Sequence, residues 1–554
     1  MLVTVDIEQK IMGNTPLFNG LRLSIEDGEK IAIIGRNGVG KTTLFRMLTG
    51  EDTDFSGSIT FRSGVRLVAT RQEHHEVSNQ SVVEYIVHNL PEYAKLHHII
   101  ETYPETMGEH LGKITRYSEA LERFAALDYY TVEDRVRRSL EDYQLGQAAD
   151  RPMSSLSGGQ KRFVELVRVE HSHADLALID EPTNHMDYVA KAAFLKWFAA
   201  CKHAVVVITH DRDLLQQVQR IIEIKDQRGV TFPGNYDAYL QQNAQRTAAD
   251  LNEYDTVQRR IVNIKKQIQD ARAKKARWGG TADKKNPFVV IETKLLKELK
   301  ELESQERPSF WIDQESVEQL RPNIEESYQK HKAKTIHIRR LTQADRQREL
   351  LALENVQVGY AATAPLFAPV TLRLQTGDRL QIVGRNGVGK STLVRAILGS
   401  LDSQRAETLL HGTITLDSHV RINTYEQEMS PQYLDMTLGN AIEHIYASFE
   451  LPVSAERIMR TLSEYLFDPY GDREHLVANL SGGQKARLQL IKLFANEPNM
   501  VILDEPTNHL DLPSIEELEA ALAQYQGTLI YISHDSYLAQ HLGGERLHLN
   551  PATL

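Results

Sequence analysis

Two identical seven-residue stretches contain the residue types needed to bind a nucleotide phosphate. Gly35 to Lys41 reads Gly-Arg-Asn-Gly-Val-Gly-Lys, and the same letters recur from Gly384 to Lys390. Each copy follows a short apolar run and precedes a helix-like segment, which predicts a strand, a glycine loop and a helix. In that setting backbone N–H groups close around a phosphate, the lysine reaches the terminal phosphates, and the next hydroxyl ligates Mg²⁺. The candidate nucleotide-binding residues are Gly35, Arg36, Asn37, Gly38, Gly40, Lys41, Thr42 and Thr43, and Gly384, Arg385, Asn386, Gly387, Gly389, Lys390, Ser391 and Thr392.

Further motifs occur twice, in the same order after each glycine loop. They are a glutamine after an apolar run (Gln72, Gln427), Leu-Ser-Gly-Gly-Gln (156–160, 480–484), Asp-Glu-Pro-Thr-Asn-His (180–185, 504–509) and His-Asp (210–211, 534–535). An ordinary glycine-rich turn has no reason to be followed twice by this series. In order and type, the motifs resemble the nucleotide-binding domains of the ATP-binding cassette superfamily, which implies two ATP sites.

The residue types suit transfer of a phosphoryl group to water, which needs charge neutralisation, a metal and a group that activates the water. Lys41 and Lys390 supply the cations, and Thr42 and Ser391 supply the metal hydroxyls. Asp180 and Asp504 end apolar runs and are predicted to hold Mg²⁺ through water, with Glu181 and Glu505 next to them as general bases. Gln72 and Gln427 are expected to bridge metal and water. A histidine at a strand end is more often structural, but His210 and His534 match the superfamily's γ-phosphate contact.

The superfamily resemblance also implies that each signature motif acts on the other half's nucleotide. Ser157, Gly158, Gly159 and Gln160 should cover ATP at Lys390, and Ser481, Gly482, Gly483 and Gln484 should cover ATP at Lys41. Neither site lacks a catalytic residue, so both are expected to hydrolyse ATP. The aromatic residue expected to stack on adenine is Tyr360 in the second half. The first half has Ile11 and Met12 there, and Met12 is the weaker substitute.

The elements that position these motifs follow from the repeat. A chain of 554 residues is too long for one core. The predicted fold is α/β, with two P-loop ATP-binding cassettes in tandem joined by a long α-helical hairpin linker. The predicted bounds are 1–237 for the first cassette with a helical arm at about 84–125, 238–349 for the linker with its tip at about 272–287, and 350–554 for the second cassette. The arm is placed there because Gln72 to Ser157 spans 31 residues more than Gln427 to Ser481. Pro91 and Pro104 are expected to break its helices.

The linker concentrates positive charge in an acidic protein. The net charge is −11, yet 259–300 holds thirteen Lys and Arg against four Asp and Glu. Apolar residues at alternating steps of three and four predict two helix seams. They are Tyr254, Val257, Ile261, Ile264, Ile268 and Ala271, then Phe288, Ile291, Leu295, Leu299 and Leu302. The tip is expected to contact RNA through Arg272, Lys274, Lys275, Arg277, Trp278, Lys284 and Lys285. The alternative is a solvated spacer.

Several classes are disfavoured by composition. No apolar run reaches the ~18 residues of a membrane span, and the N-terminus shows no secretory signal pattern. A single cysteine, Cys201, excludes a disulfide framework and a cysteine-held zinc or iron–sulfur site. These features argue against the excision-repair and ribosome-recycling cassette proteins. They predict a cytoplasmic protein.

Two cassettes, an acidic arm and a charged hairpin linker together resemble the ABC-F family of ribosome-associated ATPases. The resemblance implies binding near the tRNA exit site, with the linker directed towards P-site tRNA and large-subunit rRNA and the arm towards ribosomal proteins. It implies a monomer whose two cassettes pair with each other, using ATP and Mg²⁺, with no membrane or DNA partner. A translation factor and an antibiotic ribosome-protection protein both fit. The alternative is an ATPase subunit that docks on a separate membrane permease.

Overall fold

The computed structural model describes most of the chain, in two compact units. The described residues are 1–13, 15–70, 79–106, 108, 110–184, 186–277, 287–303, 336, 348–360, 364–400, 409–426, 429–508 and 510–552. One unit consists of Met1–Tyr236 with Thr335–Leu554, and the other of Asp237–Lys334. The first unit thus holds both glycine loops and both copies of every catalytic motif.

The first half contains two β-sheets. A parallel core with one antiparallel edge has the order β5-β6-β7-β3-β8-β9, and a smaller antiparallel sheet has the order β2-β1-β4. The strands are β1 (Val3–Met12), β2 (Thr15–Ile25), β3 (Lys30–Ile34), β4 (Ser56–Phe61), β5 (Leu67–Ala69), β6 (Leu176–Asp180), β7 (Ala204–Ile208), β8 (Arg220–Lys225) and β9 (Arg228–Pro233). β3, β6 and β7 are almost entirely buried, as their continuous apolar runs predict for central parallel strands.

The second half repeats this arrangement with a five-stranded parallel sheet, β14-β15-β16-β12-β17, and an antiparallel sheet, β11-β10-β13. Its strands are β10 (Glu349–Val358), β11 (Val370–Gln375), β12 (Arg379–Val383), β13 (Leu409–Leu416), β14 (Ile422–Tyr425), β15 (Met500–Asp504), β16 (Thr528–Ile532) and β17 (Glu545–His548). The α/β fold with tandem cassettes is confirmed.

The helices of the first half are α1 (Lys41–Thr49), α2 (Val82–His88), α3 (Tyr93–Thr106), α4 (Leu111–Ala126), α5 (Val132–Asp142), α6 (Gly158–Glu170), α7 (Tyr188–Ala200) and α8 (Arg212–Leu215). Those of the second are α13 (Lys390–Gly399), α14 (Pro431–Leu434), α15 (Leu438–Ser448), α16 (Ala455–Glu464), α17 (Gly482–Phe494), α18 (Leu512–Gln524) and α19 (Ser536–Leu542). Helices α15, α16 and α17 share one hydrophobic core, which includes Leu438, Ile442 and Leu490.

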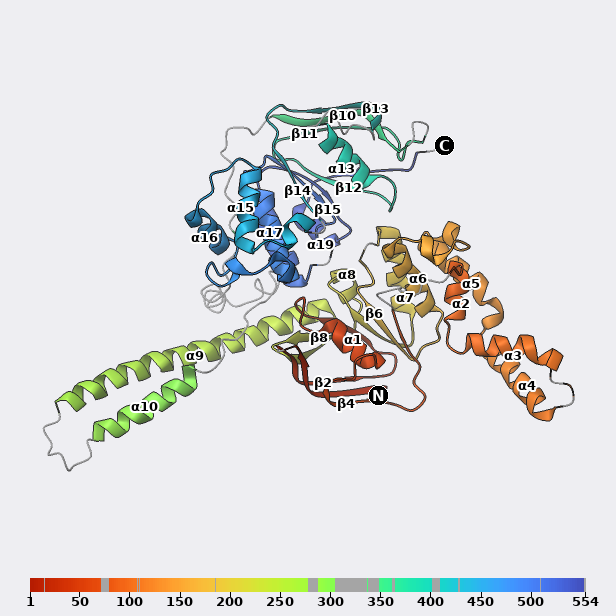
Figure 1. The fold of residues 1–554 in the computed structure, drawn as a ribbon, viewed down its shortest axis with the longest axis horizontal. Coiled ribbons are helices and arrows are strands. Elements are labelled where there is room, and N and C mark those ends of the chain that lie inside the picture. Colours follow the sequence, from red (N-terminus) through yellow and green to blue (C-terminus); the bar gives the residue numbers. More distant parts are fainter. Residues whose placement is uncertain are drawn as a thin grey trace. The chain divides into compact units, whose positions relative to one another are not determined.

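The extra residues of the first half form the helix pair α3 and α4, which lie side by side beyond α2 and α5 (Figure 1). Pro91 separates α2 from α3, as the sequence predicts. Pro104, however, lies inside α3, which ends two residues later. Rings of Tyr93, Phe124 and Tyr129 pack together at the base of the arm, and the Tyr129 hydroxyl donates to the Pro91 carbonyl at 2.6 Å. This packing fixes the direction in which the arm leaves the cassette.

The second unit contains two long helices, α9 (Tyr236–Ala276) and α10 (Pro287–Glu303), drawn side by side in Figure 1. Ile261, Ile264, Ile268 and Ala271 are buried, as their spacing predicts. On α10 the prediction that Ile291 faces the seam is wrong. Ile291 is 47% exposed and Glu292 is buried in its place. Glu292 continues the alternating spacing of Leu295, Leu299 and Leu302.

Glu292 occupies a seam position because it has cationic partners on α9. Its two carboxylate oxygens accept from Arg272 Nε at 2.8 Å and from Lys275 Nζ at 2.9 Å. The hydrogen bond from Lys275, followed by the one from Arg272, holds the pKa of Glu292 below its ordinary value. Two of the seven predicted RNA-contact residues therefore already serve the hairpin itself. Trp278, Lys284 and Lys285 lie outside the described residues.

Candidate functional site

Both glycine loops adopt a backbone that leaves room for an anion at a helix start. Gly40 and Gly389 precede α1 and α13 with φ of 99° and 103°, in the left-handed region that glycine favours. A Cβ at Gly40 would lie 2.6 Å from Leu17 Cδ2, so packing as well as dihedral angle requires glycine there. The helix N-terminus then presents its backbone N–H groups to whatever lies in the loop.

The two lysines lie across their own loops. Lys41 Nζ donates to the carbonyls of Gly35 at 2.6 Å and Arg36 at 3.1 Å, and Lys390 Nζ donates to those of Gly384 at 2.8 Å and Arg385 at 3.2 Å. Burial lowers the pKa of both lysines. The negative charges of Glu181 near Lys41 and of Glu505 near Lys390 oppose this effect but do not outweigh it. Each ammonium group thus stands at the centre of its loop, where terminal phosphates would be neutralised.

The metal-binding residues predicted for the first loop are in contact with each other. Thr42 Oγ1 donates to Asp180 Oδ2 at 3.1 Å, which joins the loop helix to the end of β6. In the second half Ser391 and Asp504 line one cavity of about 430 Å³ together with Lys390, Glu505 and His534. A hydroxyl and a carboxylate are oxygen ligands that suit Mg²⁺. These pairs therefore fit the metal that the motifs imply. Gln72 and Gln427 lie outside the described residues.

The two candidate general bases share an unusual backbone conformation. Glu181 and Glu505 have φ of 46° and 47°, in the left-handed region that is rare for residues other than glycine. Each backbone N–H donates to the end of a neighbouring strand, Ile208 at 2.8 Å and Ile532 at 2.9 Å. Such strain persists where the surrounding structure imposes it, and it clusters at functional sites. Here it turns both carboxylates out of the strand direction.

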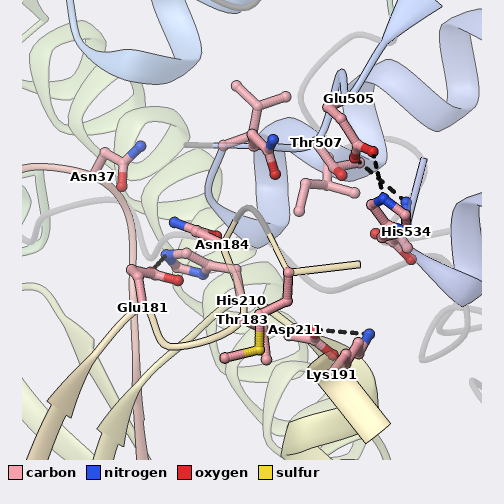
Figure 2. A pocket seen from close by; sticks show the side chains of 15 residues that line it. Asn37, Glu181, Thr183, Asn184, Lys191, His210, Asp211, Glu505, Thr507 and His534 are labelled. Carbon is pink, nitrogen blue, oxygen red and sulfur yellow. Dashed lines mark hydrogen bonds and ion pairs between the residues drawn. The ribbon is translucent and has the colours of Figure 1, made fainter. Parts of the chain in front are cut away.

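Each glutamate faces the histidine of its own half (Figure 2). Glu181 Oε1 lies 3.4 Å from His210 Nε2, and Glu505 Oε1 lies 3.2 Å from His534 Nε2. Burial, followed by the charge of Asp180, raises the pKa of Glu181 to about 8, and burial raises that of Glu505 to about 7. Burial and the nearby lysine lower the pKa of His210 to about 3 and of His534 to about 4. A bound cation would shift these carboxylates back towards the ionised form that a base needs.

Apart from these Glu–His ion-pair contacts, several buried polar atoms of the two pairs have no hydrogen-bond partner within the described part of the chain. They are both ring nitrogens of His210, Nε2 of His534 and Oε1 of Glu505. Buried polar groups normally find partners. Their position at the glycine loops fits hydrogen bonding to a phosphate and to an attacking water.

A cavity of about 200 Å³ lies between the two Glu–His pairs and is lined from both halves. Figure 2 shows Glu181 and His210 on one side and Glu505 and His534 on the other, with Lys191 held by Asp211 below them. The two candidate catalytic groups therefore open into one shared space. Asn37 of the first loop also lines it.

The signature motifs form helix N-termini. Ser157 and Ser481 cap α6 and α17, each accepting from the backbone N–H of Gln160 or Gln484, whose side chain bonds back to the serine N–H. Ser157, Gly159 and Gln160 line a cavity of about 440 Å³ with Asn386 and Gly387 of the second loop. At the other site, a Cβ on Gly482 would lie 2.6 Å from Asn37 Nδ2. The structure thus brings each signature to the glycine loop of the opposite half.

Two aspartates at these junctions were missed by the sequence reasoning. Asp187 Oδ2 accepts from the Asn386 N–H at 2.9 Å, and Asp511 Oδ2 accepts from the Asn37 N–H at 2.7 Å. Each aspartate also caps the helix of its own half, α7 or α18. The available signal was that both copies of Asn-His are followed, after one apolar residue, by Asp.

A basic side chain of each signature helix forms a hydrogen bond to the segment just before the predicted glutamine. Arg168 Nη2 donates to the Ala69 carbonyl at 2.6 Å, at the end of β5, while Glu165 holds the same guanidinium at 2.8 Å. In the second half Lys492 Nζ donates to Glu426 at 2.6 Å, the residue before Gln427. Both signature helices are thus tied to the segments that precede Gln72 and Gln427.

The two candidate adenine positions carry side chains of different character. Tyr360 is 72% exposed, lines the cavity of the second loop, and its hydroxyl lies 3.0 Å from Thr392 Oγ1. In the first half Met12 ends β1 and is 62% exposed. An aromatic face is therefore offered to a base only in the second half at these equivalent places.

Replacing Tyr360 by alanine is expected to weaken nucleotide binding at the second site by roughly 1–3 kcal/mol, because stacking of a base on an aromatic ring has this magnitude. Met12→Ala should cost less, since a thioether offers a smaller and softer contact. Binding of a fluorescent ATP analogue to variants with one loop lysine disabled measures each site separately. Equal losses for the two variants would show that the adenine sites do not differ in this way.

The comparisons with known proteins agree with this geometry. The family model described as ABC transporter matches residues 18–184 and 367–508, together more than half of the chain, and a second model of that description matches 222–319. Among relatives, ABC transporter F family member 2 of Arabidopsis thaliana is 28% identical over 94% of this chain and 72% of its own. The chain is an ABC-F type member of the ABC transporter family.

Bacterial relatives of this ABC-F type protein include the ATP-binding protein YdiF of Bacillus subtilis, 28% identical over 99% of this chain and 80% of the relative. Another is YheS of Escherichia coli K12, 29% identical over 94% and 74%. The solved structure titled "RNase-L Inhibitor" matches with a TM-score of 0.56 at 16% identity, covering 97% of this chain and 88% of that one. This likeness concerns the fold of two cassettes in one chain. The ABC-F type protein is an ATP hydrolase.

Proposed function

We propose that this ABC-F type ATPase acts on the ribosome, where ATP binding and hydrolysis by its cassettes modulate translation through the hairpin of α9 and α10. Mg²⁺ serves as the metal of both sites, and the protein works in the cytoplasm as a monomer whose cassettes pair with each other. Within the described part of the chain, no helix has the length and apolar character needed to cross a membrane.

The observation that carries the proposal is a basic stripe on α9. Arg259, Lys266 and Lys274 are exposed and form no ion pair with another described residue, and the exposed Arg277 follows the end of the helix. At ~100° per residue the three helical cations fall within a sector of ~80° on the side of α9 opposite the buried seam, and they extend over ~22 Å. Charges spaced along one helix face in this way suit the phosphates of structured RNA.

Two solved structures similar to this chain have titles that name the ribosome or a ribosomal protein, and this supports the proposed ribosomal function. They are "Model of ribosome-bound archaeal Pelota and ABCE1", with a TM-score of 0.53 at 17% identity over 96% of this chain and 76% of that one, and a complex of a ribosomal stalk protein with an archaeal recycling factor. The arm segment 84–125, which contains α3 and nearly all of α4, holds seven Glu against four Lys and Arg, and this excess of negative charge suits a basic protein partner. We propose ribosomal proteins as that partner.

The basic stripe gives a matched test of this function. Changing Lys266 and Lys274 together to glutamine should weaken ribosome association and reduce the slope of log affinity against log salt by about one to two, because each released phosphate contact contributes ~0.7–0.9. Basal ATPase should stay unchanged, since neither residue belongs to an ATP site. The control changes Lys196 and Lys202, exposed cations of the first cassette, to glutamine and removes the same charge.

The outcome distinguishes the hairpin from a spacer. If the Lys266/Lys274 and Lys196/Lys202 double variants weaken ribosome association equally, only net charge matters. If neither double variant weakens it, α9 is a spacer.

The Trp278→Ala variant should no longer affect translation, while its basal ATPase stays intact. Association with membranes instead of ribosomes would favour the permease-docking alternative. Growth with and without drugs that act at the peptidyl-transferase centre separates a protection protein from a translation factor.

A further inference from the structure

A buried ion pair joins the two cassettes beside the catalytic histidines. Arg212 is the first residue of α8 and follows His210 and Asp211 directly. Its guanidinium donates from Nη1 to Glu519 Oε1 at 2.9 Å and from Nη2 to Oε2 at 3.2 Å. The two side chains are 4% and 8% exposed. A bidentate pair of this kind, 307 positions apart in the chain, fixes both distance and orientation between the halves.

Further contacts extend this link to the second histidine. The Arg212 guanidinium lies 5.2 Å from the centre of the Tyr537 ring, and Gln216 Nε2 donates to the Tyr537 hydroxyl at 3.2 Å. Ser536 Oγ donates to Asp213 at 2.8 Å. Ser536 begins α19, which follows His534 and Asp535. The segments that carry the two catalytic histidines are therefore bonded to each other.

Glu519 also connects the pair to the first glycine loop. It lies on α18, whose N-cap Asp511 accepts the N–H of Asn37 in that loop. A displacement of α8 after a change at His210 must therefore move α18, the contact with Asn37 and α19 together. Within the described part of the chain, Arg212 and Glu519 form no hydrogen bond to a residue of either glycine loop, so their effect acts through the groups they hold.

The Arg212–Glu519 ion pair has no counterpart at the equivalent positions of the repeat. Equivalent positions in the two halves are 324 residues apart, so Arg212 corresponds to Ser536 and Glu519 corresponds to Leu195. The second copy of the contact therefore lacks both charges. The asymmetry means that the ion pair serves a different purpose from the motifs that are present in both halves.

We propose that Arg212 and Glu519 form a one-sided clamp that couples the two ATP sites, so that closure and hydrolysis at one site depend on the state of the other. Both are positioning residues. Breaking one side of a buried pair leaves an uncompensated charge in the interface, whereas replacing both partners by apolar side chains of similar volume is tolerated. The clamp can therefore be tested by comparing single with double replacements.

The experiment measures ATP hydrolysis against ATP concentration for the full chain without ribosomes, so that it does not depend on the proposed ribosomal function. Arg212→Met and Glu519→Met should each lower the Hill coefficient towards one and raise the half-saturating ATP concentration roughly tenfold, the size expected for contacting residues. The double variant should recover to within a few-fold of the original. Circular dichroism confirms that each variant is folded at the assay temperature.

Arg220→Met is the matched control, because Arg220 forms a half-buried pair with Glu29 at 2.7 Å inside the first cassette. It should lower thermal stability and leave the Hill coefficient unchanged. The proposal is overturned if the single variants keep the original cooperativity, if the double variant is as impaired as the product of the two single effects, or if Arg220→Met lowers the Hill coefficient equally.

Discussion

The double variant Glu181→Gln with Glu505→Gln is expected to lose ATP turnover by ~10²–10⁴ while it retains ATP binding, because the amide keeps the shape of the side chain but cannot accept a proton from water. Both glutamates follow the strand-end aspartates with the same backbone conformation and face a histidine. Steady-state phosphate release and equilibrium nucleotide binding measure the two properties. Unchanged turnover would refute the assignment of these residues as bases.

Stability provides the control for this variant. Burial raises the pKa of both glutamates above the ordinary value near 4.5, to about 8 for Glu181 and about 7 for Glu505. The folded, nucleotide-free protein thus binds these protons more tightly than the unfolded chain and loses stability as pH rises from about 4.5 through about 8. The glutamine variant lacks this loss. Thermal unfolding in chelator at pH 5 and pH 8.5 should show a smaller pH effect for the variant.

The second large effect concerns the signature serines. Ser157→Asp should preserve α6, since aspartate is as good an N-cap as serine and a negative charge suits a helix N-terminus. Facing a nucleotide at the second glycine loop, however, the new charge repels phosphate, and like charges in contact cost several kcal/mol. Nucleotide retention at that site should fall by ~10² or more.

The affected site identifies the pairing of the halves. In the Glu181→Gln, Glu505→Gln background, photolabelling with an ATP analogue followed by peptide mapping should show that Ser157→Asp removes label from the second cassette. Ser481→Asp should remove label from the first. Loss of label in the same half as the substitution would contradict the composite sites to which the cavity of Ser157, Asn386 and Gly387 points.

The glycine loops, signatures and strand-end carboxylates could be located from sequence because each is a local motif whose geometry a few adjacent residues determine. Gly40 requires a left-handed backbone, Ser157 caps a helix, and Asp180 ends a buried strand. The tandem repeat strengthened each assignment. The place of the arm at about 84–125 was inferred from the unequal spacing of the two copies, and α3 lies in that segment with nearly all of α4.

What the sequence could not supply were contacts between residues distant in the chain. Asp511 meets Asn37, and Arg212 meets Glu519, through the pairing of the two halves, for which no local pattern exists. The seam of α10 was misassigned at Ile291 because an apolar side chain one position away from the correct register concealed Glu292, whose burial depends on two cations of α9.

The most direct test of the ribosomal role uses the hydrolysis-deficient protein Glu181→Gln, Glu505→Gln on purified ribosomes carrying P-site tRNA. With ATP present, the protein should co-sediment with ribosomes in a ratio near one to one and arrest a reconstituted translation reaction, because in the proposed mechanism the closed cassettes reopen only after hydrolysis. The association should weaken when ATP is omitted. ATP binding without ribosome association or translational arrest would contradict the account.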